Sequence, residues 1–166
     1  TRIQVRPLML SLLLDLYDIL IDELSKKDCN IDIIYTDFAK AFDKCDFGIL
    51  AHKLKEKGIT GKIGRWLLNF LKDRTQVVTT NGSESKKVTV ESSVPQGTVL
   101  APILFLIYID NIGEGLEHHI DIRSFADDTS ASSSVESEED NRSLQQNLKK
   151  IYQWTNENNM QFNSKK

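Results

Sequence analysis

The stretch Ile120-Asp121-Ile122-Arg123-Ser124-Phe125-Ala126-Asp127-Asp128 decides how this chain is expected to fold. Its apolar and polar residues alternate up to Ala126, which is typical of a half-exposed β-strand. The small, mostly hydroxyl residues 129–134 suit the return strand of a hairpin whose turn carries Asp127 and Asp128. Adjacent carboxylates repel each other unless a positive group neutralises them, and Mg²⁺ is often bound through carboxylates together with substrate phosphates. The turn is therefore a candidate metal–phosphate site, while a solvated turn is the alternative, because Asp favours turns in general.

Outside this hairpin, helical and strand patterns follow one another along the chain. Apolar residues at helical spacing predict helices, and runs of β-branched and aromatic residues predict strands. The expected order is a helix over 8–26, a strand over 30–37, two helices between 47 and 71, a hairpin over 75–80 and 86–91, a helix over 99–109, the hairpin with the two carboxylates, and a helix over 138–157. That order is typical of an α+β fold in which helices back a mostly antiparallel sheet.

Several single residues refine these elements. Asp46 is expected to cap the helix that ends at Gly58, and Asn81-Gly82 is a strong hairpin turn signal. Residues 99–109 are apolar on every side, so a helix there should be buried. The second of the two helices predicted between 47 and 71 should bury one stripe of side chains, made of Ile63, Trp66, Leu67, Phe70 and Leu71.

Some polar and aromatic residues are not expected to take part in chemistry. Trp66 and Trp154 are interpreted as packing residues rather than as base-stacking residues. Asp43 is interpreted as a cap or a surface charge. The last helix should turn Leu144, Leu148, Ile151 and Tyr152 to one face.

Length and composition fit a single globular domain of the reduced intracellular type. The 166 residues are 40% apolar and 27% charged, with a net charge of −3, and a chain of this size can bury a core. The acidic balance does not suit a nucleic-acid binder, so the positive surface of such a protein would lie largely outside this segment. The two cysteines match no zinc spacing. No apolar run is long enough to span a bilayer, and no membrane partner is expected.

A third carboxylate extends the candidate site. Asp37 ends the strand predicted over 30–37, and neighbouring strands of a sheet lie about 5 Å apart. Strand ends that meet in one sheet would bring Asp37, Asp127 and Asp128 together. Such a cluster can clamp two metal ions roughly 4 Å apart, which stabilise the attacking and leaving oxygens of an in-line phosphoryl displacement. The residues therefore indicate metal-assisted phosphoryl transfer.

Four stretches, in order along the chain, resemble the catalytic motifs of reverse transcriptases. They are Tyr35-Thr36-Asp37-Phe38-Ala39-Lys40-Ala41-Phe42-Asp43, Ser93-Val94-Pro95-Gln96-Gly97-Thr98-Val99-Leu100, Phe125-Ala126-Asp127-Asp128 and Asn163-Ser164-Lys165-Lys166. Together with the sequence of residues 105–112, these motifs are most similar to those of non-LTR retrotransposons of the jockey and CR1-like groups. The resemblance implies a polymerase palm with a ferredoxin-like antiparallel sheet, and RNA-directed DNA synthesis with Mg²⁺, or Mn²⁺ in its place.

The resemblance also assigns roles to single residues in the metal site. Asp37 and Asp127 match the main metal ligands, Asp128 completes the carboxylate trio, and the backbone carbonyl of Phe38 faces a metal. Lys166 matches the lysine proposed to protonate the leaving pyrophosphate. If strand alternation persists into the turn, Asp127 points to the polar face and Asp128 is the more peripheral ligand.

The nucleotide contacts follow from the same resemblance. Phe42 matches the bulky residue under the incoming sugar, which excludes a 2′-hydroxyl by steric clash. Gln96 and Gly97 match the loop that contacts nucleotide and template, and Gly suits a close backbone approach to a ligand. Phe125 stands where Tyr is common, and Ser93 and Ala101 stand where Gly is common, but none of these removes a group that the mechanism needs.

The implied protein is the reverse transcriptase of a non-LTR retroelement, with an RNA template, a DNA primer or target and deoxynucleotides as partners. Residues 1–166 would be a partial reverse transcriptase domain that holds the end of the fingers and the palm, without thumb and primer grip, so the isolated segment should be almost inactive. The alternative is a decayed or domesticated module that binds RNA or protein without catalysis. The family also implies work at nuclear DNA, although no localisation signal is visible.

Overall fold

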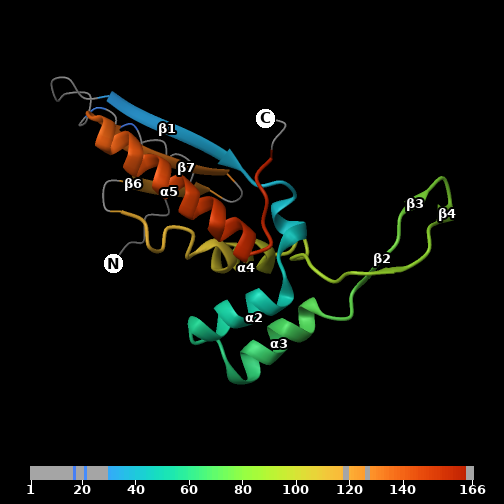
Figure 1. Cartoon of the computed structure of the whole chain (residues 1–166). Helices are drawn as coiled ribbons and strands as arrows, with labels where there is room; N and C mark the ends of the chain where they lie inside the picture. Colours follow the sequence, from blue (N-terminus) through green and yellow to red (C-terminus); the bar gives the residue numbers. More distant parts are fainter. Residues whose placement is uncertain (1–16, 18–20, 22–29, 118–119, 126–127, 164–166) are drawn as a thin grey trace, which may run out of the picture. The chain divides into compact units, whose positions relative to one another are not determined.

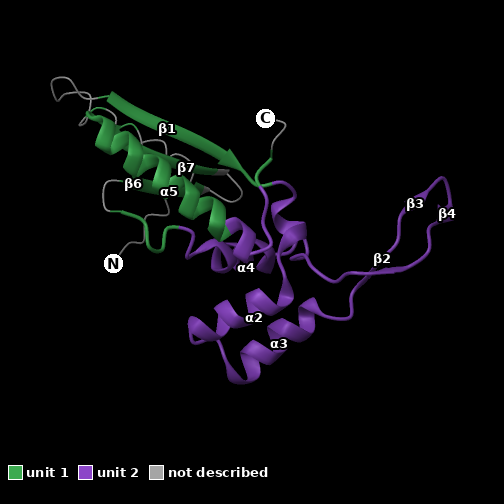
Figure 2. Cartoon of the chain, viewed as in Figure 1, with its two compact units in different colours: residues 1–38, 113–154, 162–166 green, residues 39–112, 155–161 purple. Residues whose placement is uncertain are grey.

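The computed structural model describes residues 17, 21, 30–117, 120–125 and 128–163 of the chain (Figure 1). These residues belong to two compact units, each assembled from separate segments of the chain (Figure 2). Unit 1 consists of residues 1–38, 113–154 and 162–166, and unit 2 consists of residues 39–112 and 155–161. Most of the helix predicted over 8–26 lies outside the described residues. None of the described helices is both long enough and apolar enough to cross a membrane.

Unit 1 is built on a three-stranded antiparallel sheet with the order β1-β7-β6. Strand β1 spans Asn30–Asp37, β6 spans Ile120–Phe125 and β7 spans Asp128–Val135. All eight residues of β1 pair with β7, from Asn30 opposite Val135 to Asp37 opposite Asp128. The predicted strand over 30–37 and the predicted second hairpin are therefore confirmed, and β7 is the central strand.

The long helix α5 (Glu138–Glu157) matches the helix predicted over 138–157. Its residues up to 154 belong to unit 1. Ser137 and Asp140 form a reciprocal cap at its start: Asp140 N donates to Ser137 Oγ at 3.2 Å, and Ser137 N donates to Asp140 Oδ2 at 2.9 Å. This capping arrangement satisfies backbone donors of the first turn. Leu144, Asn147, Ile151 and Trp154 are buried, whereas Tyr152, which was expected on the inward face, is 60% exposed.

Unit 2 contains three helices, α2 (Phe47–Glu56), α3 (Gly61–Leu71) and α4 (Leu100–Ile109). The side chain of Asp46 caps α2 as predicted, since its Oδ1 accepts from Gly48 N at 2.8 Å and from Ile49 N at 2.9 Å. The helix ends at Glu56, and Gly58 follows with a φ of +76°. That left-handed conformation favours glycine and ends the helix where the sequence predicted.

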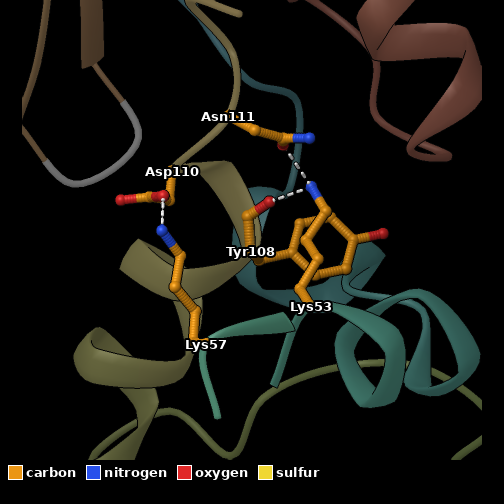
Figure 3. A network of polar contacts seen from close by, with 5 residues as sticks. All are labelled: Lys53, Lys57, Tyr108, Asp110 and Asn111. Carbon is orange, nitrogen blue, oxygen red and sulfur yellow. Dashed lines mark hydrogen bonds and ion pairs between the residues drawn. The ribbon is translucent and has the colours of Figure 1, made fainter. Parts of the chain in front are cut away.

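The core of unit 2 forms where α2, α3 and α4 contribute fully buried side chains, among them Leu50, Leu54, Leu71, Leu104 and Phe105. A polar network fastens α2 to the end of α4 (Figure 3). The buried Lys53 ammonium donates to the carbonyl of Tyr108 and to Asn111 Oδ1, the latter at 2.8 Å, and Lys57 pairs with Asp110. Carbonyl groups at the C-terminal end of a helix carry partial negative charge, so a cation is stabilised there.

Burial also changes the acidity of two groups in unit 2. Desolvation raises the pKa of the buried Cys45 thiol to about 12 and the pKa of the Tyr108 phenol to about 12. The Tyr108 hydroxyl donates to Asn158 O at 2.6 Å and accepts from Asp46 N at 3.2 Å. Both groups therefore stay protonated in the folded protein well above neutral pH.

The buried faces of α3 and α4 are narrower than the sequence predicted. In α3 the buried residues are Gly64, Leu67 and Leu71, whereas Ile63 is 67% exposed and Trp66 is 56% exposed. In α4, Ile103 and Leu106 are about half exposed, so this helix is not buried on every side. The prediction for α3 was confirmed for the helix and for Leu67 and Leu71. It was wrong for Ile63 and Trp66, because the chosen stripe is wider than the seam that the rest of the core covers.

The hairpin predicted over 75–91 is present but is paired over short stretches. Strand β2 (Thr75–Gln76) pairs with β5 (Val88–Thr89), and β3 (Thr79–Thr80) pairs with β4 (Ser83–Glu84). Asn81 and Gly82 form the turn with φ values of 49° and 78°, as a type I′ turn requires. The return strand begins at Ser83 rather than at the predicted Lys86, because a two-residue turn continues the pairing at once.

Candidate active site

Two of the predicted carboxylate residues meet across the sheet of unit 1. Asp37 is the last residue of β1, and Asp128, the first residue of β7, lies directly opposite Asp37 in the register. Residues opposite each other in an antiparallel pair have Cα atoms about 4.5–5.5 Å apart. Phe125 is the partner of Asp128 on the other side, so the backbones of three motif residues lie side by side at this edge. Asp127 lies outside the described residues.

Asn163 adds a contact to this edge of the sheet that was not predicted. Its backbone N–H donates to the carbonyl of Asp37 at 2.8 Å, and its side-chain Nδ2 donates to Asp37 Oδ2 at 3.1 Å. A hydrogen bond to an ionised carboxylate stabilises the charged form. The sequence analysis gave a role only to the lysine of the fourth motif. Asn163, the first residue of that motif, was the signal in the sequence that could have predicted this contact. Lys166 itself lies outside the described residues.

The residue after Asp37 is held by aromatic packing. The ring of Phe38 is 2% exposed and stacks on Phe162 with centroids 5.1 Å apart, and Trp154 lies at 6.2 Å. Phe38 and Phe162 also form an isolated antiparallel bridge. This packing fixes the chain on both sides of the contact between Asp37 and Asn163. The packing role predicted for Trp154 is confirmed.

In unit 2 the first two motifs contact each other. Phe42 lies in the short 3₁₀ helix η1 (Ala41–Lys44), and its half-buried ring stacks on Phe105 of α4 with centroids 4.7 Å apart. The backbone N–H of Val94 donates to the carbonyl of Phe42 at 2.9 Å. Phe42 is therefore both packed on the core and partly exposed.

A side-chain hydrogen bond orients Gln96. Gln96 is exposed, and its Nε2 donates to Asp43 Oδ1 at 3.2 Å. The Ser92 hydroxyl donates to the carbonyl of Asp43 at 2.7 Å. Asp43 is exposed, as predicted for a surface charge, and in the structure it also joins the first motif to the loop of the second.

The loop at Gly97 depends on backbone conformation. Gly97 has a φ of +81°, and a Cβ atom placed there would meet no atom within 4 Å. Glycine is therefore favoured by the left-handed backbone rather than by crowding from this chain. Thr98 lies just before α4, where its hydroxyl donates to Pro95 O at 2.8 Å and accepts from Ala101 N of the first turn at 3.2 Å.

The described residues do not by themselves complete a metal site. Within the described ranges, no group of three or more His, Cys, Asp or Glu side chains is arranged to hold a metal ion. The carboxylate trio includes Asp127, which those ranges omit. The donors that are in place at this edge are the Asp37 carboxylate and the backbone of Asp128, held by the β1–β7 register.

An antiparallel sheet with acidic motif residues at adjoining strand ends, packed with a helix, is the arrangement expected of a polymerase palm. The family model described as "Reverse transcriptase (RNA-dependent DNA polymerase)" matches residues 6–166. The chain belongs to this reverse transcriptase family. The predicted family and the α+β fold class are confirmed.

A relative supports the non-LTR assignment. The chain is 28% identical over 130 residues to the "Retrovirus-related Pol polyprotein from type-1 retrotransposable element R2" of Popillia japonica. The match covers 71% of this chain and 18% of the relative, so the chain spans less than a fifth of that protein's length.

Solved structures of telomerase from Candida tropicalis share the fold. The apo enzyme, truncated from its C-terminal domain, matches with a TM-score of 0.58 at 14% identity, over 84% of this chain and 30% of the telomerase chain. A telomerase complex with the TWJ fragment of telomeric RNA matches with a TM-score of 0.66 at 14% identity, over 94% of this chain and 28% of that one. At this identity the likeness concerns the fold.

Proposed function

We propose that this chain provides the nucleotidyl-transfer centre of an RNA-directed DNA polymerase encoded by a non-LTR retroelement. The observation that carries the proposal is the β1–β7 register, which sets Asp37 directly opposite Asp128 in a chain of the reverse transcriptase family. The whole enzyme would extend a DNA primer with deoxynucleotides on an RNA template. Nuclear DNA is the expected target.

Reverse transcriptases generally use divalent metal ions, and the residues at the sheet edge fit such ions. Mg²⁺ takes oxygen ligands, and carboxylates are the donors that this edge offers. We assign the ligands to Asp37, Asp127, Asp128 and the backbone carbonyl of Phe38. Two Mg²⁺ ions, or Mn²⁺ in their place, would supply charge stabilisation for the attacking 3′-hydroxyl and the leaving pyrophosphate.

Asn163 would act on the metal site through Asp37. Its side-chain N–H on Asp37 Oδ2 favours the ionised carboxylate and restricts the rotation of that side chain. Lys166, three residues further along the chain, would give a proton to the leaving pyrophosphate. Asn163 is thus a positioning residue, and Lys166 is the proposed general acid.

The motif residues of unit 2 would bind the nucleotide. Phe42 would exclude a 2′-hydroxyl, because its ring is held by Phe105 and cannot retreat without losing that stacking contact. Gln96, held by Asp43, would contact nucleotide and template, and Gly97 would allow the backbone to approach the ligand. Selection of deoxynucleotides would therefore depend on packing inside unit 2.

Primer extension on an RNA template, with the full-length parent protein, tests the proposal. Asp37→Asn and Asp127→Ala should lower the rate by on the order of 1,000-fold, because metal charge stabilisation contributes several kcal/mol to the barrier. Asp32→Asn is the matched control, since Asp32 is an exposed residue of the same strand. It should leave the rate unchanged within about twofold.

Undiminished synthesis by the Asp127→Ala enzyme would refute the assignment. RNA binding by the wild-type parent without any extension would instead favour the decayed or domesticated module. Residues 1–166 alone should show almost no extension, since they span only 18% of the R2 relative's length. Robust extension by this segment would contradict that part of the proposal.

A further inference from the structure

The outer face of α3 carries an exposed aromatic residue, Trp66, which stacks on the half-buried Phe70. Trp66 is 56% exposed and Ile63 is 67% exposed, and the Trp66 ring stacks on Phe70 with centroids 5.9 Å apart and planes 20° apart. The buried seam of the helix is supplied by Gly64, Leu67 and Leu71. Because Trp66 and Phe70 are four residues apart, they lie on the same side of the helix. The exposed Trp66 indole, stacked on the half-buried Phe70 ring, has apolar surface that burial would stabilise.

Basic side chains border the aromatic pair. Lys62 precedes Trp66 by four residues, so the two side chains are neighbours on the helix surface. Arg65 and Asn69 form the next row around the helix, and all three polar residues are exposed. The helix sequence Gly61–Leu71 contains no acidic residue. In the described part of the chain, neither Lys62 nor Arg65 forms an ion pair.

Charge and ring chemistry together select the partner class. Proteins that bind single-stranded nucleic acid combine cationic side chains along the backbone with aromatic rings on which bases stack. The cores of protein–protein interfaces are also rich in aromatic residues and arginine, but they are depleted in lysine. A helix with two free-standing cations beside an exposed indole, and with no carboxylate, therefore complements a polyphosphate chain better than a protein surface.

We infer that the α3 face formed by Lys62, Ile63, Arg65, Trp66 and Phe70 binds single-stranded RNA, with a base stacked on Trp66. The choice of RNA rests on the proposed function, which supplies an unpaired template strand. The contact itself needs neither metal nor nucleotide. It can therefore be measured separately from polymerisation, and it changes the packing role predicted for Trp66 into a binding role.

The test is the affinity of the 166-residue chain for a fluorescent oligouridine of about 12 nucleotides, a length within the range that such sites cover. Binding is followed by anisotropy without metal and without deoxynucleotides. Trp66→Ala should weaken binding by on the order of 10-fold, the effect of removing one stacking ring. Lys62→Gln should reduce the slope of log affinity against log salt by about 0.7.

Two matched controls come from α5 in unit 1. Tyr152 is an aromatic residue that is 60% exposed, and Lys149 is an exposed lysine. Tyr152→Ala and Lys149→Gln should leave both affinity and salt slope unchanged. Because all four positions are exposed, the variants should unfold at the same temperature as the wild type, which circular dichroism checks.

Three results would overturn the inference: equal affinity of Trp66→Ala and wild type, equal losses in the Trp66 and Tyr152 variants, or tighter binding of duplex RNA than of oligouridine. Asp37→Asn should bind oligouridine as the wild type does. If Asp37→Asn abolishes extension by the parent but keeps oligouridine binding, the RNA-binding inference still holds. If the wild-type chain does not bind oligouridine although the parent enzyme extends primers, the RNA-binding inference alone is refuted.

Discussion

The two units of the molecule differ in what stabilises each of them internally. Among the described residues, the largest fully buried side chains lie in unit 2, with Asn147 of unit 1 as the exception. The sheet of unit 1 has instead a central strand, β7, made mostly of small hydroxyl residues. Its order comes from continuous pairing, eight residues with β1 and six with β6.

This difference separates two kinds of sensitivity. A shift of one residue in the pairing of a strand moves every side chain to the opposite face of the sheet. The relation between Asp37 and Asp128 therefore depends on backbone register, whereas the relation between Phe42 and Phe105 depends on how well a core is packed. Substitutions of the buried core residues of unit 2 should act mainly on stability, and substitutions near the sheet edge mainly on chemistry.

The largest expected effect is on the packing of unit 2. Phe105→Ala should lower the free energy of unfolding by about 3–5 kcal/mol, because it leaves a cavity under Phe42 where a fully buried ring was. Leu106→Ala on the same helix is the control, since Leu106 is 47% exposed and should cost clearly less. Urea unfolding measures both, and equal losses would contradict the proposed contrast between the two sides of α4.

A smaller effect should separate charge from packing at the sheet edge. Asn163→Asp places a second carboxylate beside Asp37 with almost no change in volume. A like charge disfavours the ionised form, so the pKa of the coupled pair rises. The acid limb of primer extension by the parent enzyme should move to higher pH by about one unit. Asn163→Ala, which removes the amide without adding charge, should move it less, and identical profiles for the two variants would exclude a role for charge.

The smallest expected effect is a loss of stability at alkaline pH, which arises from two buried groups of unit 2. Cys45 and Tyr108 both belong to unit 2, and burial raises the pKa of each to about 12, from ordinary values of 9.0 and 10.0. Above those ordinary values the unfolded chain loses protons that the folded protein retains, so stability should fall as pH rises from about 9 towards 12. Cys45→Ala should fall less steeply in urea unfolding between pH 8 and 11. A slope equal to that of the wild type would show that the thiol does not contribute.

Local signals in the sequence identified much of the fold. The β1 strand, the Asp46 cap, the Asn81-Gly82 turn and the bounds of α5 all follow from residues within a few positions of each other. Each has a physical cause that does not require the rest of the chain: side-chain alternation, a capping oxygen, a positive φ or a helical period. The motifs also predicted that Asp37 would be close to the carboxylate hairpin.

Long-range contacts were not visible in the same way. The hydrogen bond between Gln96 and Asp43 joins residues 53 positions apart, and the one between Asn163 and Asp37 joins residues 126 positions apart. Helical spacing alone placed Ile63 and Trp66 inside, because it gives a direction but not the width of the partner surface. The uniformly apolar α4 gave no direction at all. The roles of Asp127 and Lys166 remain predictions, since both lie outside the described residues.

The wide separation of β1 and β7 in the chain has a consequence for biosynthesis. Roughly 90 residues separate Asp37 from Asp128, and at about 5–20 residues per second a ribosome needs some 5–20 s to make them. During that interval the central strand that pairs with β1 does not yet exist, although unit 2 residues 39–112 have already been made. An unpaired strand is a template for association with other chains. The catalytic edge therefore forms only after β7 has been made, and until then β1 is exposed to association with other chains.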